Sequence, residues 1–320
     1  MPYNDLISAD ATDDALIPVP VAREIIQQIP QASATLALSR RITMSSRTQR
    51  MPVLSVLPLA YFVGGDIGLK QSTSADWKNV NLNVEEIAVL VPVPEAYLDD
   101  AQMPIWDEVR PLVVEAIGGV FDAATLFGTN KPVTWPTAIY PGTLAAGNVI
   151  VKGAGSTDIA QNVTTMGEEL AKDGFPVSGF AARPGFNWNL LGLRSAGSEK
   201  LPIYEPDMQN GRGGNLYGFP MREVANGAWD SSEAELIGGD WSKSIVGVRQ
   251  DITFTRHTDG VITDADGLVV MNAMQQDSVI FRAVFRAAWA TANPSNRLKP
   301  TYTDATRYPF ATVQATTANS

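Results

Sequence analysis

The clearest hydrophobic pattern in this chain is a pair of extended segments separated by a polar stretch. Residues 53–63 (VLSVLPLAYFV) are rich in β-branched and aromatic side chains, and residues 78–93 (KNVNLNVEEIAVLVPV) alternate polar and apolar positions before becoming apolar. Both patterns are typical of β-strands, although Pro58 favours an edge position. The residues between them, 64–77, are rich in turn-forming Gly, Ser and Asp. The pattern predicts one long hairpin, whose apolar arms need a covering surface such as a neighbouring subunit.

Two helices are predicted directly after this hairpin. A short one covers residues 94–100, where proline takes the favoured first position. A long one covers residues 103–129 and ends at Gly128, a residue type typical of helix ends. Its apolar side chains recur at three- and four-residue spacing: Val109, Leu112, Val113, Ala116, Ile117, Val120, Phe121 and Ala124. Pro111 implies either that the regular helix begins near Asp107 or that it is kinked.

Helices and strands alternate in the remainder of the chain. Helices are predicted over residues 156–174 and 184–194, with a short strand at 177–182 between them. Residues 195–218 are dense in glycine and predict a loop. The segments that then predict strands are residues 220–224, 235–239, 244–249, 251–256 and 276–291.

The first 35 residues have the composition of an arm. Four aspartates in residues 5–14 precede an apolar stretch, and residues 21–29 predict about two turns of helix, too short to be stable alone. Such an arm requires another surface to lie on. The aspartates stand where a signal peptide has basic residues, and no apolar run is long enough to cross a bilayer. Neither signal-directed export nor membrane contact is therefore expected.

The amino-acid composition excludes several kinds of catalytic and metal-binding site. The 320 residues include no cysteine, which excludes disulfides, thiolate nucleophiles and zinc sites built on sulfur. His257 is the only histidine, which excludes two-histidine metal sites and most acid–base relays. The net charge of −10 is opposite in sign to that of proteins that grip nucleic acid through its phosphates. A protein of this charge is expected to enclose DNA rather than to bind it.

Three candidate motifs are better explained as ordinary structure. The glycine-rich residues 211–218 (GRGGNLYG) lack the preceding strand, the following helix and the Lys-Ser/Thr of a phosphate-binding loop. Residues 264–267 (DADG) lack the remaining ligands of a calcium loop and predict a turn between strands. His257 has no Gly-x-Ser-x-Gly motif to accompany it and is expected at a strand end. No catalytic, cofactor or metal site is predicted.

In their order along the chain, these segments resemble the tailed-bacteriophage major capsid proteins of the Hong Kong 97-type fold, which encapsulin shells share. The resemblance covers nearly the whole sequence. Residues 16–42 resemble the family's opening arm, and residues 46–90 its extended loop. Residues 91–129 resemble its short and long helices, and residues 166–206 its axial domain. The closing strands are resembled by residues 215–224, 236–254 and 275–291.

The resemblance implies an α+β subunit with five parts. They are an N-terminal arm (1–45), an extended hairpin loop with its base strands (46–92), a peripheral domain with a spine helix (93–130), an axial domain (131–235), and peripheral-domain strands with a C-terminal segment (236–320). The chain departs from the family in two ways. GGDIG stands where Glu-Gly is frequent, and almost nothing precedes the arm, which implies a separate scaffolding protein or none.

The function implied by the resemblance is that of a major capsid protein and not of an enzyme. Such subunits self-assemble as pentamers and hexamers into an icosahedral shell around double-stranded phage DNA, in the host cytoplasm. Portal, scaffolding and decoration proteins are the further partners it implies. Two alternatives stay open: an encapsulin-like compartment holding cargo protein, and, from another class, a soluble hydrolase or solute-binding protein. The last would need a convergent polar pocket, for which this composition offers few side chains.

Candidate intersubunit contacts lie near the arm and in the hairpin. A stretch without acids contains four arginines, Arg40, Arg41, Arg47 and Arg50. They are expected on a solvated strand face, against acids of a neighbour, or against DNA. The other candidates are Asp66, Lys70 and Trp77. The resemblance also makes Lys70 a candidate for a cross-link to an asparagine of a neighbour, which needs a desolvated neutral amine beside a carboxylate.

Overall fold

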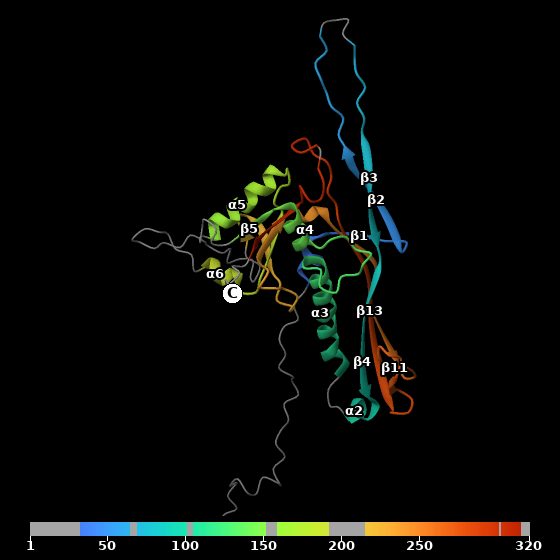
Figure 1. Ribbon diagram of the computed structural model, residues 1–320. Helices are drawn as coiled ribbons and strands as arrows, with labels where there is room; N and C mark the ends of the chain where they lie inside the picture. Colours follow the sequence, from blue (N-terminus) through green and yellow to red (C-terminus); the bar gives the residue numbers. More distant parts are fainter. Residues whose placement is uncertain are drawn as a thin grey trace, which may run out of the picture.

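The computed structural model describes residues 33–64, 69–100, 105–151, 159–191, 215–300 and 302–314. The predicted arm helix at residues 21–29 and most of the predicted loop at 195–218 lie outside these ranges. Within them the chain forms two larger sheets, helices beside each, and two hairpins at opposite ends of the molecule (Figure 1). None of the described helices is both long enough and apolar enough to span a membrane.

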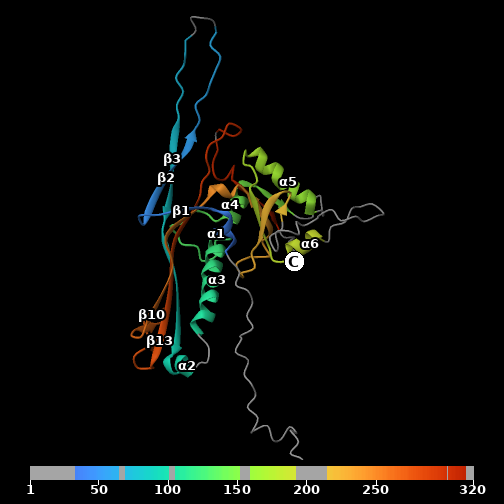
Figure 2. The same cartoon turned by 180° about the vertical axis from the view of Figure 1, so that it is seen from behind.

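The longer hairpin consists of β2 (Thr48–Val56) and β3 (Asp76–Asn83). The two strands pair antiparallel along their length, which confirms the predicted hairpin. Figures 1 and 2 show it extending beyond the rest of the molecule. The strand predicted at residues 53–63 ends early, and residues 57–64 are outside regular structure. Pro58 explains the early end, because its ring nitrogen has no hydrogen for a ladder bond.

A four-stranded sheet, in the order β1–β10–β13–β4, continues from the base of this hairpin. β1 (Arg40–Thr43) runs parallel to β10 (Ser244–His257), and β13 (Ser278–Thr291) runs antiparallel to both β10 and β4 (Glu85–Pro94). The two strands predicted at 244–249 and 251–256 form the single strand β10, with register shifts on either side of Gln250.

The predicted long helix is confirmed as α3 (Ile105–Leu126), which packs on this sheet. Phe121 of α3 lies in the core with its ring edge-on to Phe285 of β13, 6.3 Å between centroids. The helix begins before Asp107, so Pro111 stands in its second turn. Gly128 follows the helix with a φ of 82°, the left-handed conformation expected at a helix end. The short helix predicted at residues 94–100 is confirmed as α2 (Glu95–Asp100).

The second sheet has six strands in the order β5–β14–β9–β6–β8–β7. They are β5 (Val149–Val151), β6 (Gly179–Ala182), β7 (Asn215–Leu216), β8 (Phe219–Glu223), β9 (Ala234–Gly239) and β14 (Phe310–Gln314). The helices of this part are α4 (Ile139–Ala146), α5 (Ile159–Lys172) and α6 (Phe186–Leu191). Met166 and Leu170 of α5 share a buried core with Phe180 and Leu236 of the sheet. Both predicted helices and the strand between them are confirmed within the described residues.

The predicted division between residues 235 and 236 does not follow the two sheets. It falls inside β9, and β14 pairs with β9 and β5 instead of joining the strands of the four-stranded sheet. Residues 292–309 carry the chain from β13 to that six-stranded sheet. The range 236–320 is therefore shared between both sheets. The strand β14 is only five residues long and its partners are distant in sequence, so local pattern did not reveal it.

The shorter hairpin consists of β11 (Val261–Thr263) and β12 (Val269–Asn272). The predicted turn between them is confirmed, since the Asp264 carboxylate accepts a hydrogen bond from the amide of Leu268 at 2.8 Å. His257 ends β10 as predicted, with Nε2 3.1 Å from Oγ1 of Thr255. The remaining elements are the 3-10 helix η1 (Trp241–Lys243) and the short helix α1 (Ala34–Leu38).

Candidate assembly surfaces and their junctions

The long hairpin carries large apolar side chains that the described chain leaves exposed. Leu59, Phe62 and Leu69 are 67%, 105% and 91% exposed, and the Trp77 ring on β3 is 62% exposed. Removing apolar surface from water is favourable by about 25 cal/mol per Å². Exposed apolar side chains gathered on one projecting element therefore mark it as a surface for another protein. Trp77 and Lys70, two of the predicted contacts, are both exposed here, and Asp66 lies outside the described residues.

The four predicted arginines lie at the base of this hairpin. All are exposed: two on β1, one in the turn that follows it, and one on β2. Nε of Arg41 donates to the carbonyl oxygen of Leu36 at 2.7 Å. Among the described residues, no acidic side chain forms an ion pair with any of the four.

A polar cleft of about 390 Å³ lies where the base of the hairpin meets the four-stranded sheet. It is lined by Arg47, Val84, Glu85, Glu86, Arg249 and Arg286. Arg286 and Glu86 form an ion pair with 3.1 Å between Nε and Oε2. Arg249 donates to two main-chain carbonyls in the turn after β1, those of Met44 and Ser45. These contacts join β13 to β4 and β10 to the turn after β1, beside the base of the hairpin.

The start of the described chain is fixed by a buried carboxylate, Asp122, on α3. Its oxygens accept hydrogen bonds from the Ser33 hydroxyl at 2.6 Å and from the amides of Ala34 and Thr35 at 3.0 Å. A fourth donor is Nδ2 of Asn226, at 2.8 Å. Asp122 is wholly buried. Four donors on one carboxylate replace the water it loses on burial, so α1 is held firmly on α3.

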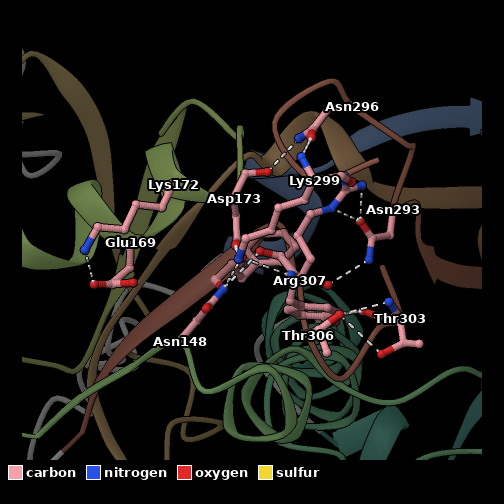
Figure 3. Close-up of polar contacts among 12 residues, drawn as sticks. Asn148, Glu169, Lys172, Asp173, Asn293, Asn296, Lys299, Thr303, Thr306 and Arg307 are labelled. Atoms are coloured by element: carbon pink, nitrogen blue, oxygen red, sulfur yellow. Dashed lines mark hydrogen bonds and ion pairs between the residues drawn. The ribbon is translucent and has the colours of Figure 1, made fainter. Parts of the chain in front are cut away.

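A second buried carboxylate, Asp173, ties residues 292–309 to the six-stranded sheet (Figure 3). Its Oδ1 lies 2.5 Å from Nζ of Lys299, and its Oδ2 accepts from Nδ2 of Asn148 at 2.9 Å and from the amide of Tyr308 at 3.3 Å. Asn296 donates to the carbonyl oxygen of the same aspartate at 2.6 Å. The side chain and the main-chain carbonyl of Asp173 therefore bind three residues of the connecting segment, Lys299, Tyr308 and Asn296.

The neighbouring Arg307 is wholly buried and holds the middle of that segment together (Figure 3). Nη2 and Nε donate to Oδ1 of Asn293 at 2.9 and 3.3 Å, and Nη1 donates to the carbonyl oxygen of Lys299 at 3.3 Å. The guanidinium also lies over the Tyr302 ring, 3.8 Å from its centroid. Burial lowers the pKa of Arg307 and raises the pKa of Tyr308. Sequence reasoning missed both junctions, because their partners are far apart in the chain.

Within the described ranges, no three side chains of His, Cys, Asp or Glu are grouped to hold a metal ion. The polar residues described above contact each other and the main chain, and they join elements of the fold. The candidate functional features described here are surfaces: the hairpin and the arginines at its base.

A family model described as the phage capsid family matches residues 14–300. The chain belongs to the phage capsid family. It is 25% identical over 269 residues to the major capsid protein of Staphylococcus phage 80alpha, covering 82% of this chain and 78% of that protein. A solved structure from Microbacterium phage Oxtober96 matches with a TM-score of 0.82 and 36% identity, over 96% of this chain and 99% of that one. One from Mycobacterium phage Adephagia matches at 0.79 and 27%, over 96% and 97%.

These similarities confirm the α+β fold of the Hong Kong 97 type and the function of a phage major capsid protein. A member of this family has a structural role, and its place is the capsid of the virion. Capsid proteins assemble into oligomeric shells. The encapsulin-like compartment and the soluble hydrolase or solute-binding protein are not favoured.

Proposed function

We propose that this capsid protein self-assembles as pentamers and hexamers into an icosahedral shell that encloses double-stranded phage DNA, and that assembly takes place in the host cytoplasm. The observation that supports this most directly is the projecting hairpin with Phe62 and Leu69 almost fully exposed. Full burial of one such side chain is worth about 1.5–3 kcal/mol. A hairpin with several such side chains buries them when it lies on a neighbouring copy. In a closed symmetric shell every subunit makes the same contact, so every subunit contributes the same free energy of burial.

The parts of the subunit take separate roles in this proposal. The six-stranded sheet with α4, α5 and α6 is the axial domain around the axis of a pentamer or hexamer. The four-stranded sheet with α3 is the peripheral domain, which meets other capsomers, and the β2–β3 hairpin is the extended loop. The strand β14 is assigned to the axial domain because it pairs with β9 and β5.

In this proposal the shell encloses DNA and does not bind a specific DNA sequence. The chain carries a net charge of −10, so its average field repels phosphates. The exposed Arg40, Arg41, Arg47 and Arg50 are assigned to acidic groups of a neighbouring subunit. A portal, a scaffolding protein and decoration proteins are proposed as further partners.

Asp66, Lys70 and Trp77 are proposed as hairpin contacts to a neighbour, and Lys70 as the amine of a cross-link. Lys70 is exposed in the single chain. Its amine would lose water only under a neighbouring subunit, and desolvation favours the neutral, nucleophilic form. A denaturing gel of assembled shells tests the cross-link: a ladder of covalent multimers supports it, and a single monomer band contradicts it.

The shell proposal is tested by electron microscopy and size-exclusion chromatography of the purified protein and two variants. The unchanged chain is expected to form closed, uniform shells or rings of five or six. The double variant Phe62→Ser/Leu69→Ser should stay dissociated, because the hairpin no longer gains burial on a neighbour. Val133→Ser is the matched control, since Val133 is 98% exposed outside the hairpin.

Two results would contradict the proposal at different points. If the unchanged chain remains a monomer or dimer even with a scaffolding protein present, the shell itself is wrong. If the hairpin variant assembles as well as the Val133 variant, shells form but the hairpin is not the surface that drives them.

A further inference from the structure

The short hairpin of β11 and β12 carries exposed apolar side chains on both of its faces. Leu268, Val269 and Val270 follow one another at the start of β12 and are 67%, 64% and 63% exposed. Successive side chains of a strand point to opposite faces of a sheet. Neither face is therefore covered at these positions by another described part of the subunit. Apolar side chains left uncovered together mark a surface for another protein.

The same hairpin is acidic. Residues 257–277 contain no lysine or arginine and four aspartates: Asp259, Asp264, Asp266 and Asp277. All four are exposed, and within the described part of the chain none of them forms an ion pair. Arg256, directly before this stretch, already pairs with Glu95, at 3.6 Å between Nη2 and Oε1. A protein that covers this hairpin should therefore present positive charge beside apolar side chains.

The base of the long hairpin presents that combination. Residues 40–50 contain four exposed arginines and no acid. Exposed apolar side chains continue this surface along the hairpin, with Val56 40% and Leu59 67% exposed. The two acids of the adjoining cleft already have partners: Glu86 is in an ion pair, and Glu85 accepts a hydrogen bond from a threonine hydroxyl at 2.7 Å. The two surfaces are therefore complementary, one acidic and apolar, the other basic and apolar.

These two surfaces cannot meet within one subunit. The strand β10 runs past both, because Ile245–Val248 pair with β1 at one end of it, and His257 adjoins the short hairpin at the other. Nine residues separate Val248 from His257, which is about 30 Å of strand. Figure 1 shows β11 at the end of the sheet away from β2 and β3. A contact between the two surfaces therefore needs two copies of the chain.

We propose that the short hairpin of one copy docks on the base of the long hairpin of the next copy. Its acidic turn faces Arg47 and Arg50, and Leu268 to Val270 lie beside the apolar side chains of the long hairpin. This inference rests on the proposed shell assembly and names the two surfaces that meet in it. Each copy offers one surface and receives the other, so the contact repeats from copy to copy and closes around an axis.

The test is a charge exchange in the full-length protein. The acid variant is Asp259→Lys/Asp266→Lys, and the base variant is Arg47→Glu/Arg50→Glu. Asp264 is left unchanged, because its carboxylate accepts the amides of Asp266 and Leu268 and forms the turn. The fraction of protein in shells or rings is measured by size-exclusion chromatography and electron microscopy. Each variant alone should assemble at least about tenfold less, because like charges then face each other.

The decisive sample combines the acid and base variants, which exchanges the charges and restores complementarity. It should recover most of the assembly of the unchanged chain. The matched control combines the acid variant with Lys172→Glu/Arg222→Glu, two exposed cations near the six-stranded sheet. Both combinations keep the net charge of −10. The control should stay as poorly assembled as the acid variant, because its added carboxylates lie away from the contact.

Three results would overturn the docking. They are normal assembly of the acid variant, loss of assembly in the base variant alone, and a combined variant that recovers no more than the control. The second would assign the arginines to a different partner, such as DNA. If the unchanged chain fails to assemble even with a scaffolding protein present, the shell proposal itself is wrong, which distinguishes the two failures.

A neutral variant provides a second measurement that does not depend on reversed charges. Asp259→Asn/Asp266→Asn keeps the size of both side chains, and both are exposed, so the melting temperature of the dissociated subunit should change by less than about 2 °C. At low salt this variant should assemble several-fold less than the unchanged chain. The difference should shrink as salt screens the charges. Equal assembly of the two proteins at low salt would contradict the contact.

Discussion

Asp122 is a carboxylate whose charge is balanced by hydrogen bonds alone. Among the described residues no cation forms an ion pair with it, yet it is wholly buried between Ser33, the amides that begin α1, and Asn226. Burying a charge is tolerated only when its lone pairs are satisfied. Three of the four donors belong to residues 33–35, at the start of α1, and the fourth belongs to Asn226. Asp122 therefore positions the whole start of the described chain.

Asp122→Asn should lower the free energy of unfolding by about 1–3 kcal/mol, because one acceptor oxygen becomes a donor that faces other donors. Asp107→Asn is the control, since Asp107 is exposed on the same helix and its substitution should change stability by less than about 0.5 kcal/mol. Urea unfolding of both variants measures the difference. Equal midpoints for the two variants would show that the carboxylate is dispensable.

Residues of this kind could not be found from the sequence. The Ser33–Asp122 bond spans 89 positions, and the bond between Tyr308 and Asp173 spans 135. No local pattern records a contact over that distance, and an aspartate in a helix is ordinary on its own. By contrast, the hairpin that carries Trp77 and Lys70 is visible in the local pattern, and the resemblance to the capsid family made Lys70 a candidate. Their contacts with a neighbour stay predictions.

At the scale of elements, the sequence predicted those whose side chains repeat regularly. The β2–β3 hairpin, α3 and α5 each show a period of two or of three to four residues, and all three are present. β1 and β14 have four and five residues, too few for a period to appear, and each is placed by pairing with a strand distant in sequence. Length and local regularity thus decided which elements could be predicted.

The hairpin should be the first part of a dissociated subunit to be cut by trypsin, and assembly should protect it. Lys70 is exposed next to main chain that no strand pairs, so a protease can bind an extended segment there. Lys172 is the internal control, because it is exposed but lies at the end of α5. Mass spectrometry of the fragments should show cleavage after Lys70 first in dissociated subunits and much later in shells. Equal cleavage in both states would mean that no neighbour covers the hairpin.

At the scale of the molecule, the two sheets share a buried core, which includes Phe285 of β13 and Phe310 of β14, and the described residues that connect β13 to β14 lie outside helices and strands. Residues 292–309 lead from β13 to β14, which lies second from the edge of the other sheet, between β5 and β9. The segment has no strand ladder, and it is held by isolated main-chain hydrogen bonds, such as Ser295 N–H to the carbonyl oxygen of Leu54 at 2.8 Å, and by side chains. Asp173 and Arg307 supply those contacts, one to the six-stranded sheet and the other within the segment (Figure 3).

Removing the charge of Lys299 should therefore destabilise the subunit much more than removing that of Lys172. Both lysines pair with carboxylates, but Lys299 faces Asp173, whose side chain is 3% exposed, whereas Lys172 pairs with Glu168 and Glu169 on the surface. An uncompensated buried carboxylate costs about 3–5 kcal/mol and a broken surface pair at most about 1 kcal/mol.

The Lys299 side chain is 42% exposed, so water can replace part of the lost contact. Lys299→Met should then lower the free energy of unfolding by about 2 kcal/mol, and Lys172→Met should lower it much less, because water screens its surface pairs. Methionine keeps most of the hydrocarbon stem, so the comparison isolates the charge. Denaturant unfolding of the dissociated subunit measures both changes. If the two variants lose the same stability, the ion pair between Lys299 and Asp173 does not hold the connecting segment.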